Sequence, residues 1–155
     1  MVEFTHIQND RAQMVDISSK GDVTREAVAA GKIFLRQETL AAIRDGTVVK
    51  GNVLTTARVA ATLSVKNTPI LIPMCHSIAI SAIDVDFIEG DGFIGVSVRV
   101  KTTGKTGVEM EALTGVSVAL LTVWDMVKSA EKDDDGQYPY TRISDVRVVE
   151  KIKGT

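Results

Sequence analysis

The sequence predicts an α+β sandwich in which helices pack on one face of an antiparallel sheet. Two segments, 78–88 and 93–101, alternate apolar and polar side chains as half-buried strands do, and the Asp91-Gly92 pair between them is a strong hairpin-turn signal. Residues 105–128 are apolar or small on almost every side, which is typical of a long helix buried in a core. These strand and helix patterns together indicate the α+β class.

The first half of the chain predicts one strand and two helices. Residues 24–35 carry mixed signals: their alanines favour a helix, whereas Gly31 and the apolar end of the segment favour a strand. We interpret this segment as a strand. Residues 36–44 are predicted to form a short helix that ends at the Asp-Gly pair that follows. Residues 53–66 place apolar side chains at helical spacing and predict a second helix.

The second half adds the hairpin, the long helix and a closing strand. Residues 70–76 are apolar but contain Pro73, which cannot donate to a central ladder, so they predict an edge or a turn. Residues 142–152 predict the last strand. The resulting order of elements is close to a ferredoxin-like plan. We expect one domain over residues 1–155, with residues 1–13 as a flexible arm.

Composition and charge argue against several functional classes. The chain is 45% hydrophobic and 25% charged with a net charge of −2, which is ordinary for a globular protein and gives no basic surface for nucleic acid. We find no secretory signal and no apolar run that approaches the ~20 residues of a membrane span. The lone cysteine, Cys75, cannot form an internal disulfide and suits a reducing compartment. We therefore expect a cytoplasmic protein that binds neither nucleic acid nor membrane.

Four charged residues on the long predicted helix need an explanation. Thr106 and Glu109 fit a capping box, Glu111 suits the first turn, and Lys128 suits the last turn. Lys128 could also form an ordinary ion pair with Asp125, three residues away. Asp125 stands inside an apolar run with no capping role, so it is the strongest catalytic candidate. We expect a neighbouring subunit to bury it.

The spacing of two of these carboxylates predicts an unusual site. Glu111 and Asp125 lie fourteen residues apart, or about 21 Å along a helix axis. One reacting centre cannot touch both. Either the site is elongated, as for a nucleoside triphosphate, or the two side chains serve different copies of a site made by two chains.

Other sequence motifs also allow a functional and a purely structural interpretation. Cys75-His76 lies at the mouth of a predicted turn, where His76 is a candidate proton carrier, although a lone histidine is as often a packed residue. Lys50 precedes the second helix and suits a phosphate, or is simply solvated. The only histidines are His6 and His76, so no Cys/His zinc set exists. The G-x-G-x-x-G letters at 90–95 lie between two strands and indicate a hairpin, not a dinucleotide loop.

Five segments, in this order, together resemble one protein family. They are Met14-Val15-Asp16-Ile17-Ser18 with Lys20, Lys50-Gly51 with Val53 and Ala57-Arg58, residues 71–76, residues 104–114, and Asp125-Met126 with Lys128. They are similar to the cyclic pyranopterin monophosphate synthase family of molybdenum-cofactor biosynthesis. The resemblance runs from about residue 14 to the last predicted strand.

The resemblance implies a lyase that converts a cyclised dihydro-GTP into cyclic pyranopterin monophosphate and releases pyrophosphate. It implies a ferredoxin-like fold and a homohexamer, built as a trimer of dimers with active sites at subunit interfaces. It implies no cofactor and no metal ligands, and it leaves open whether Mg²⁺ accompanies the triphosphate.

The same resemblance assigns roles to individual residues. Asp125, Lys128 and Lys50 match the catalytic residues of the family. The matching substrate-binding positions are Met74, Cys75, His76, Glu109, Met110 and Glu111. The chain departs from the family pattern at Ser77, where proline is usual, and in its tail, residues 151–155, whose two lysines keep part of the usual positive charge.

An alternative from another functional class is a non-enzymatic nucleotide-binding assembly module, which needs the basic residues but not Asp125. Release of pyrophosphate from the cyclised substrate distinguishes the two. For the enzyme, we hypothesise that Asp125 and Lys128 exchange protons, which requires burial and mutual charge to bring their pKa values toward neutrality.

Overall fold

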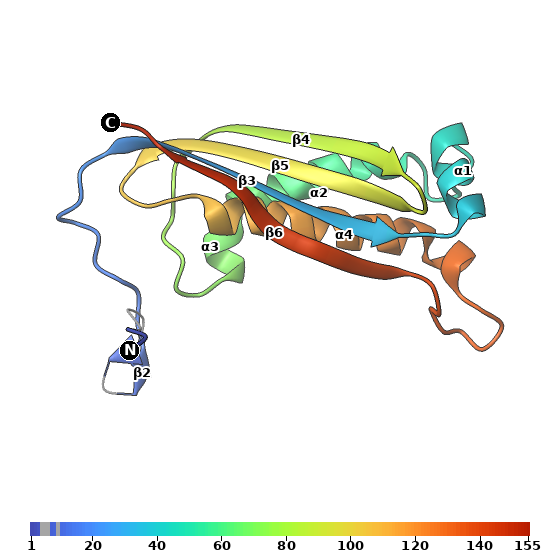
Figure 1. Cartoon of the computed structure of the whole chain (residues 1–155), viewed down its shortest axis with the longest axis horizontal. Helices are drawn as coiled ribbons and strands as arrows, with labels where there is room; N and C mark the ends of the chain where they lie inside the picture. Colours follow the sequence, from blue (N-terminus) through green and yellow to red (C-terminus); the bar gives the residue numbers. More distant parts are fainter. Residues whose placement is uncertain (4–6, 9) are drawn as a thin grey trace.

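The protein is a four-stranded antiparallel sheet with helices on one face (Figure 1). The computed structural model describes residues 1–3, 7–8 and 10–155. The strand order is β4–β5–β3–β6. The strands are β3 (Val23–Phe34), β4 (Ile80–Gly90), β5 (Phe93–Gly104) and β6 (Arg142–Lys153). This confirms the predicted α+β class and is consistent with a ferredoxin-like arrangement.

The helices form the second layer. α2 (Val53–Lys66) and α4 (Glu109–Glu131) pack against each other beneath the sheet, while α1 (Gln37–Asp45) follows β3 at one end of the molecule (Figure 1). The short α3 (Thr68–Leu71) comes directly after α2, and no strand forms around Pro73, as its ring predicts. The predicted strands and helices are therefore confirmed.

The N-terminal arm lies apart from the main sheet. It contains the two short strands β1 (Ile7–Gln8) and β2 (Arg11–Ala12), which pair only with each other. The predicted flexible arm falls partly on residues 4–6 and 9, which include His6 and lie outside the described residues. From β2 the chain runs through an irregular segment back to the start of β3 (Figure 1).

Contact with α4 explains the mixed composition of β3. Ala27 and Ala29 are fully buried in the core. At Gly31, a Cβ atom would lie 2.9 Å from side-chain carbons of both Val116 and Leu120 on α4. Small residues on β3 therefore let the helix approach the sheet closely. The alanines form a strand because pairing with β5 and β6 on both sides outweighs their own weak preference for helix.

The start of α4 differs from the prediction. The helix begins at Glu109, four residues later than expected, because β5 continues its pairing with β3 to Gly104 and the next residues form the connecting loop. The N-cap residue is Val108, and no side chain caps the helix, so the capping box predicted for Thr106 is wrong. The side chain of Glu109 is instead paired with Lys151 of β6.

α4 is the central helix of the core. By length and composition alone it could cross a membrane, but more than half of its most apolar stretch is buried inside this chain. At Gly115, a Cβ atom would lie 2.8 Å from Val65 of α2 and 3.0 Å from Val98 of β5. The helix thus touches both layers at once, which is typical of the core helix of a folded domain.

The carboxylate of Glu131, at the end of α4, is hydrogen-bonded to residues at the start of α1. Glu131 is fully buried. It accepts hydrogen bonds from the hydroxyls of Thr39, at 2.5 Å, and Thr141, at 2.7 Å. It also accepts the backbone N–H of Arg36, the N-cap residue of α1, at 3.2 Å. This network satisfies the buried charge and fixes the far end of the molecule.

We predict that Glu131→Ala lowers the free energy of unfolding by about 3–5 kcal/mol, because each buried donor left without an acceptor costs about 1–3 kcal/mol. Glu131→Gln is the matched control: it keeps one acceptor oxygen and should lose roughly half as much. Urea denaturation of the three proteins measures the difference. A Glu131→Ala protein within about 1 kcal/mol of the parent would show that the network adds little.

Candidate active site

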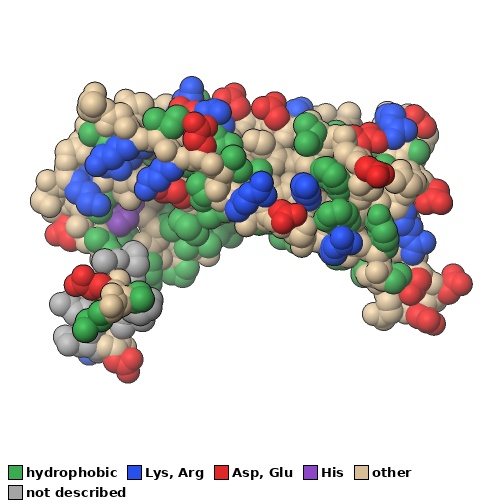
Figure 2. Space-filling view, viewed as in Figure 1, with side chains coloured by type: hydrophobic (Ala, Val, Ile, Leu, Met, Phe, Trp, Pro, Cys, Tyr) green, Lys and Arg blue, Asp and Glu red, His purple; other side chains and the backbone are tan. Residues whose placement is uncertain are grey.

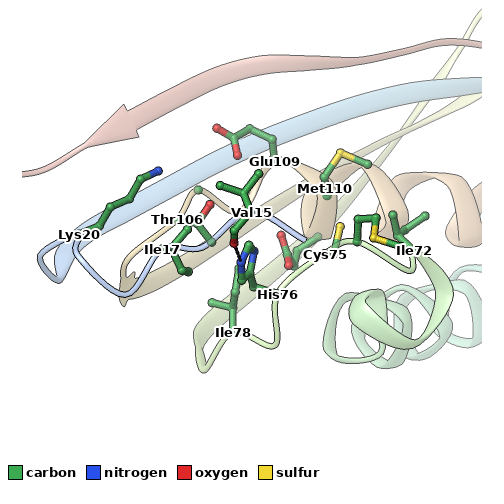
Figure 3. A pocket seen from close by; sticks show the side chains of 13 residues that line it. Val15, Ile17, Lys20, Ile72, Cys75, His76, Ile78, Thr106, Glu109 and Met110 are labelled. Atoms are coloured by element: carbon green, nitrogen blue, oxygen red, sulfur yellow. Dashed lines mark hydrogen bonds between the residues drawn. The ribbon is translucent and has the colours of Figure 1, made fainter. Parts of the chain in front are cut away.

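A cavity of about 550 Å³ lies where three segments meet at the N-terminal end of α4 (Figure 3). The irregular segment before β3 forms one wall, the turn after α3 forms the second, and the loop into α4 forms the third. The lining residues are Val15, Ile17 and Lys20, then Ile72, Met74, Cys75, His76 and Ile78, and finally Thr106, Gly107, Glu109, Met110 and Glu111.

All six predicted substrate-binding residues therefore line one cavity. Three come from the turn after α3 and three from the first turn of α4, although these segments lie more than thirty residues apart in the sequence. The turn is closed by a hydrogen bond from the Cys75 N–H to the Ile72 carbonyl, at 3.1 Å. His76 lies 2.6 Å, Nε2 to oxygen, from the Val15 carbonyl (Figure 3).

The two carboxylates at the start of α4 have opposite electrostatic environments. Burial raises the pKa of Glu111, which is only 2% exposed, and the nearby charge of Glu109 adds to the shift. Partial burial also acts to raise the pKa of Glu109, but hydrogen bonding to Lys151 and that lysine's charge outweigh it, so the pKa lies below its ordinary value. Glu111 is therefore suited to carry a proton, and Glu109 to stay ionised.

The cysteine in the cavity is not an activated nucleophile. Burial raises the pKa of the Cys75 thiol, and the negative charge of Glu111 raises it further. A raised pKa keeps the thiol protonated at neutral pH, which removes the thiolate that nucleophilic chemistry needs. Cys75 thus contributes a small polarizable wall to the cavity rather than a reacting atom.

The three predicted catalytic residues form a separate cluster. The Lys50 ammonium lies 3.0 Å from the Asp125 carboxylate and donates to the Asp125 backbone carbonyl at 2.9 Å. The Lys128 ammonium also lies 3.0 Å from that carboxylate. Lys50 reaches this position from the turn before α2, because α2 and α4 pack side by side. One carboxylate is therefore held between two cations.

Within one chain Asp125 is not buried, and its pKa does not move toward neutrality as hypothesised. The Asp125 side chain is 57% exposed, so this chain does not itself bury it. Hydrogen bonds from Lys50, then from Lys128, hold the pKa of Asp125 below its ordinary range, and Asp125 raises the pKa of Lys128. These pKa values move away from neutrality because opposite charges in contact keep each other ionised.

The cavity and the cluster lie at different positions along α4. Glu111 faces the cavity and Asp125 lies fourteen residues further on, about 21 Å along the axis. A single chain therefore brings together the six predicted binding residues, and separately the three predicted catalytic residues, but not the two groups. Both alternatives inferred from the spacing of Glu111 and Asp125 therefore remain. The site is either elongated or made by two chains.

A smaller cavity of about 300 Å³ adjoins the first through Lys20, which lines both. Its other lining residues include Arg25 of β3 and Lys153 of β6. The Arg25 guanidinium is oriented by hydrogen bonds to the backbone carbonyls of Gly104, at 3.0 Å, and Lys105, at 3.2 Å. Figure 2 shows Lys and Arg side chains gathered at this end of the molecule. The arrangement is suited to an anion.

Sequence patterns did not identify every residue of the cavity wall. Val15 and Ile17 lie in the first of the five segments that resemble the family, but no sequence pattern assigned either of them to a binding site. Ile78 lies outside those segments, and Gly107 lies within the fourth but had no predicted role; both enter the wall through the way two loops meet. Among the described residues, no group of three or more His, Cys, Asp or Glu side chains could hold a metal ion.

Comparison with known proteins identifies the family. The model of the MoaC family matches residues 14–154. The chain belongs to the MoaC family. Probable cyclic pyranopterin monophosphate synthases from Methanoregula boonei and Methanosphaerula palustris are 73% and 68% identical over 154 residues, covering 99% of this chain and 99% and 100% of their own lengths. A probable cyclic pyranopterin monophosphate synthase from Pyrococcus abyssi is 57% identical over 150 residues, covering 97% of this chain and 94% of its own.

Burial of the Glu111 carboxylate makes the stability of the folded protein depend on pH. Because its pKa is raised in the folded state, the folded protein holds the proton more tightly, and stability falls as pH rises through the ordinary carboxyl pKa toward the raised one. Glu111→Gln removes that charge. We predict a Tm above that of the parent at pH 7 and close to it near pH 4, measured by calorimetry.

Glu109→Gln is the control, and we expect it to change the Tm at pH 7 in the opposite direction. The pKa of Glu109 is lowered in the folded state, so its contribution to stability is present at neutral pH and is lost as pH falls through the lowered value. The variant should have a lower Tm than the parent at pH 7, with the gap closing in acid. A shift of the same sign in both variants would contradict the assignment of the two environments.

Proposed function

We propose that this chain catalyses the formation of cyclic pyranopterin monophosphate from a cyclised dihydro-GTP, with release of pyrophosphate, in molybdenum-cofactor biosynthesis in the cytoplasm. The observation that carries the proposal is membership of the MoaC family along nearly the whole chain, with relatives named as synthases of this product. Those names favour an enzyme over a non-enzymatic nucleotide-binding module. The enzyme class proposed is a lyase.

The main cavity is suited to the fused rings of the substrate. Its volume, about 550 Å³, lies in the usual range of small-molecule sites, ~300–1,000 Å³. Val15, Ile72 and Ile78 provide apolar wall, and His76 and Glu111 provide polar groups with which a base and a sugar can bond. The raised pKa of Glu111 allows it to donate a proton during ring opening.

The adjoining basic cavity is suited to the triphosphate. Lys20, Arg25 and Lys153 line it, and Lys20 also reaches the main cavity, so one guest can occupy both. Arg25 enters with its guanidinium already oriented, which lowers the entropic cost of binding a phosphate oxygen. Lys153 lies at the end of β6, where the tail of this chain departs from the usual family pattern.

The Lys50–Asp125–Lys128 cluster is proposed to perform the phosphoryl transfer. A sugar hydroxyl oxygen attacks the phosphorus nearest the sugar, the bond from that phosphorus to the bridging oxygen breaks, and pyrophosphate leaves. The two ammonium groups neutralise the charge that develops on the leaving group. When they turn to the phosphates, Asp125 loses the partners that lower its pKa and becomes a better acceptor for the hydroxyl proton.

We also propose that the site is completed between chains of a homohexamer, arranged as a trimer of dimers. Support comes from apolar side chains more than half exposed on the helical layer: Val59, Leu63, Ile70, Leu71 and Leu121. Figure 2 shows hydrophobic side chains gathered on the lower side of the view at the place where α3 lies in Figure 1. Burying this surface against a second chain would cover Asp125 and bring its cluster to a cavity that it cannot reach within its own chain.

We predict that Asp125→Asn and Lys128→Ala each lower kcat for pyrophosphate release by about 10²–10⁴-fold, the usual contribution of a proton-transfer group. The assay supplies the cyclised substrate, with plain GTP as the negative control, and is run with and without EDTA to test for Mg²⁺. Light scattering checks that the oligomer persists. Pyrophosphate release absent from the parent chain, with substrate binding intact, would support the binding-module alternative.

Mixed oligomers test whether sites are shared. We predict that mixing Asp125→Asn chains with Glu111→Gln chains restores activity, because some interfaces then combine an intact cluster with an intact cavity. Mixing Asp125→Asn with Lys50→Ala chains is the matched control. Both changes damage the same intrachain cluster, whose groups are 3.0 Å apart, so no site becomes complete. Equal activity in the two mixtures would contradict sharing between chains.

A further inference from the structure

The irregular segment before β3 is attached to the cavity through backbone groups. Its Lys20 carbonyl accepts a hydrogen bond from the Lys105 ammonium, at 2.7 Å. A turn within the segment is closed by the Lys20 N–H, which donates to the Ile17 carbonyl at 3.0 Å. The second attachment is the contact between His76 Nε2 and the Val15 carbonyl, at 2.6 Å. In Figure 3 the ring of His76 and the Val15 carbonyl point toward each other across the cavity wall.

The chemistry of the Val15 contact selects one state of the histidine. A carbonyl oxygen can only accept, so Nε2 must carry the hydrogen, whether the ring is neutral or charged. In the neutral ring, Nδ1 is then the nitrogen with a free lone pair. Because His76 lines the main cavity, the segment before β3 determines which of its nitrogens can take up a proton.

We propose that Val15 is a positioning residue, whose carbonyl holds His76 as the Nε2–H tautomer and so makes Nδ1 the proton acceptor of the cavity. The role of His76 in catalysis rests on the proposed function, but its tautomer does not. The bond comes from the main chain, so it persists through any substitution of the Val15 side chain that leaves the segment docked. It is lost when the segment leaves the cavity.

The segment is held in place by apolar contact as well as by these bonds. The side chains of Val15 and Ile17 line the cavity, and both are partly buried. Replacing both by glycine removes this contact and leaves His76 itself unchanged. The matched control, Val2→Gly with Met14→Gly, removes two apolar side chains at exposed positions of the arm that do not line the cavity.

Nitrogen-15 NMR of the histidine side chains tests the tautomer without substrate. The chain has two histidines, so a His6→Gln background leaves a single imidazole to observe. We expect the neutral ring to show a protonated Nε2 and an unprotonated Nδ1. The Val15→Gly/Ile17→Gly variant should shift toward a mixture of tautomers, and the control should not. A protonated Nδ1 in the parent, or a tautomer unaffected by the cavity-side glycines, would overturn the proposal.

Kinetics then separate the two nitrogens. In His76→Gln the amide nitrogen can reach the position of Nε2 and keep the bond to Val15, so we expect kcat to fall by about 100-fold while KM stays within about threefold. In His76→Asn the amide nitrogen lies nearer the position of Nδ1, so the segment is released and KM should rise about tenfold as well. Equal KM values in the two variants would contradict a role for the Val15 bond in closing the cavity.

The NMR measurement of the tautomer and the assay of pyrophosphate release test different claims. A parent chain that shows the expected tautomer but releases no pyrophosphate would leave the positioning role intact and remove the proposed function. An active parent chain with the other tautomer would leave the proposed function intact and remove the positioning role of Val15.

Discussion

The close packing of α4 against the sheet is the constraint on which the other features depend. A Cβ atom at Gly31 of β3 or at Gly115 of α4 would lie within 2.9 Å of neighbouring side chains, so both positions accept only hydrogen without a shift of their neighbours. This packing fixes where the first turn of α4 meets the turn after α3, and so creates the main cavity. The same helix carries Asp125 away from that cavity and places it beside Lys50 of the neighbouring turn.

The helix also places its carboxylates in contrasting electrostatic environments. Glu111 is buried and its pKa is raised, whereas Asp125 is exposed between two cations and its pKa is lowered. A raised carboxyl pKa suits donation of a proton to a ring, and an ionised carboxylate beside ammonium groups suits a phosphate-binding region. Differences of this kind between groups in one site are how enzymes assign acid and base roles. These environments fit the acid role proposed for Glu111 and the phosphate-binding role proposed for the cluster around Asp125.

Different interactions hold the two ends of the molecule. At the far end, the buried Glu131 network joins α1, α4 and the start of β6 through hydrogen bonds that water cannot easily replace. At the cavity end, a segment outside the sheet supplies a wall and the carbonyl that contacts His76. A site built from loops on a packed scaffold is a common arrangement for small-molecule binding, because the scaffold keeps the polar groups in place while the loops form the wall.

The sequence by itself determined the class of fold, the strands, the hairpin and the identity of the family, because hydrophobic periodicity and short motifs are local properties of the chain. It also selected six residues that the fold brings to one cavity and three that it brings to one cluster. Tertiary structure decided the rest. The start of α4 depends on how far β5 pairs with β3, which a capping pattern cannot reveal. The direction of the Asp125 pKa shift depends first on Lys50, which lies 75 residues away in the sequence. The wall formed by Val15 exists only because a distant turn approaches it, since non-local contacts of this kind leave no periodic trace in the sequence.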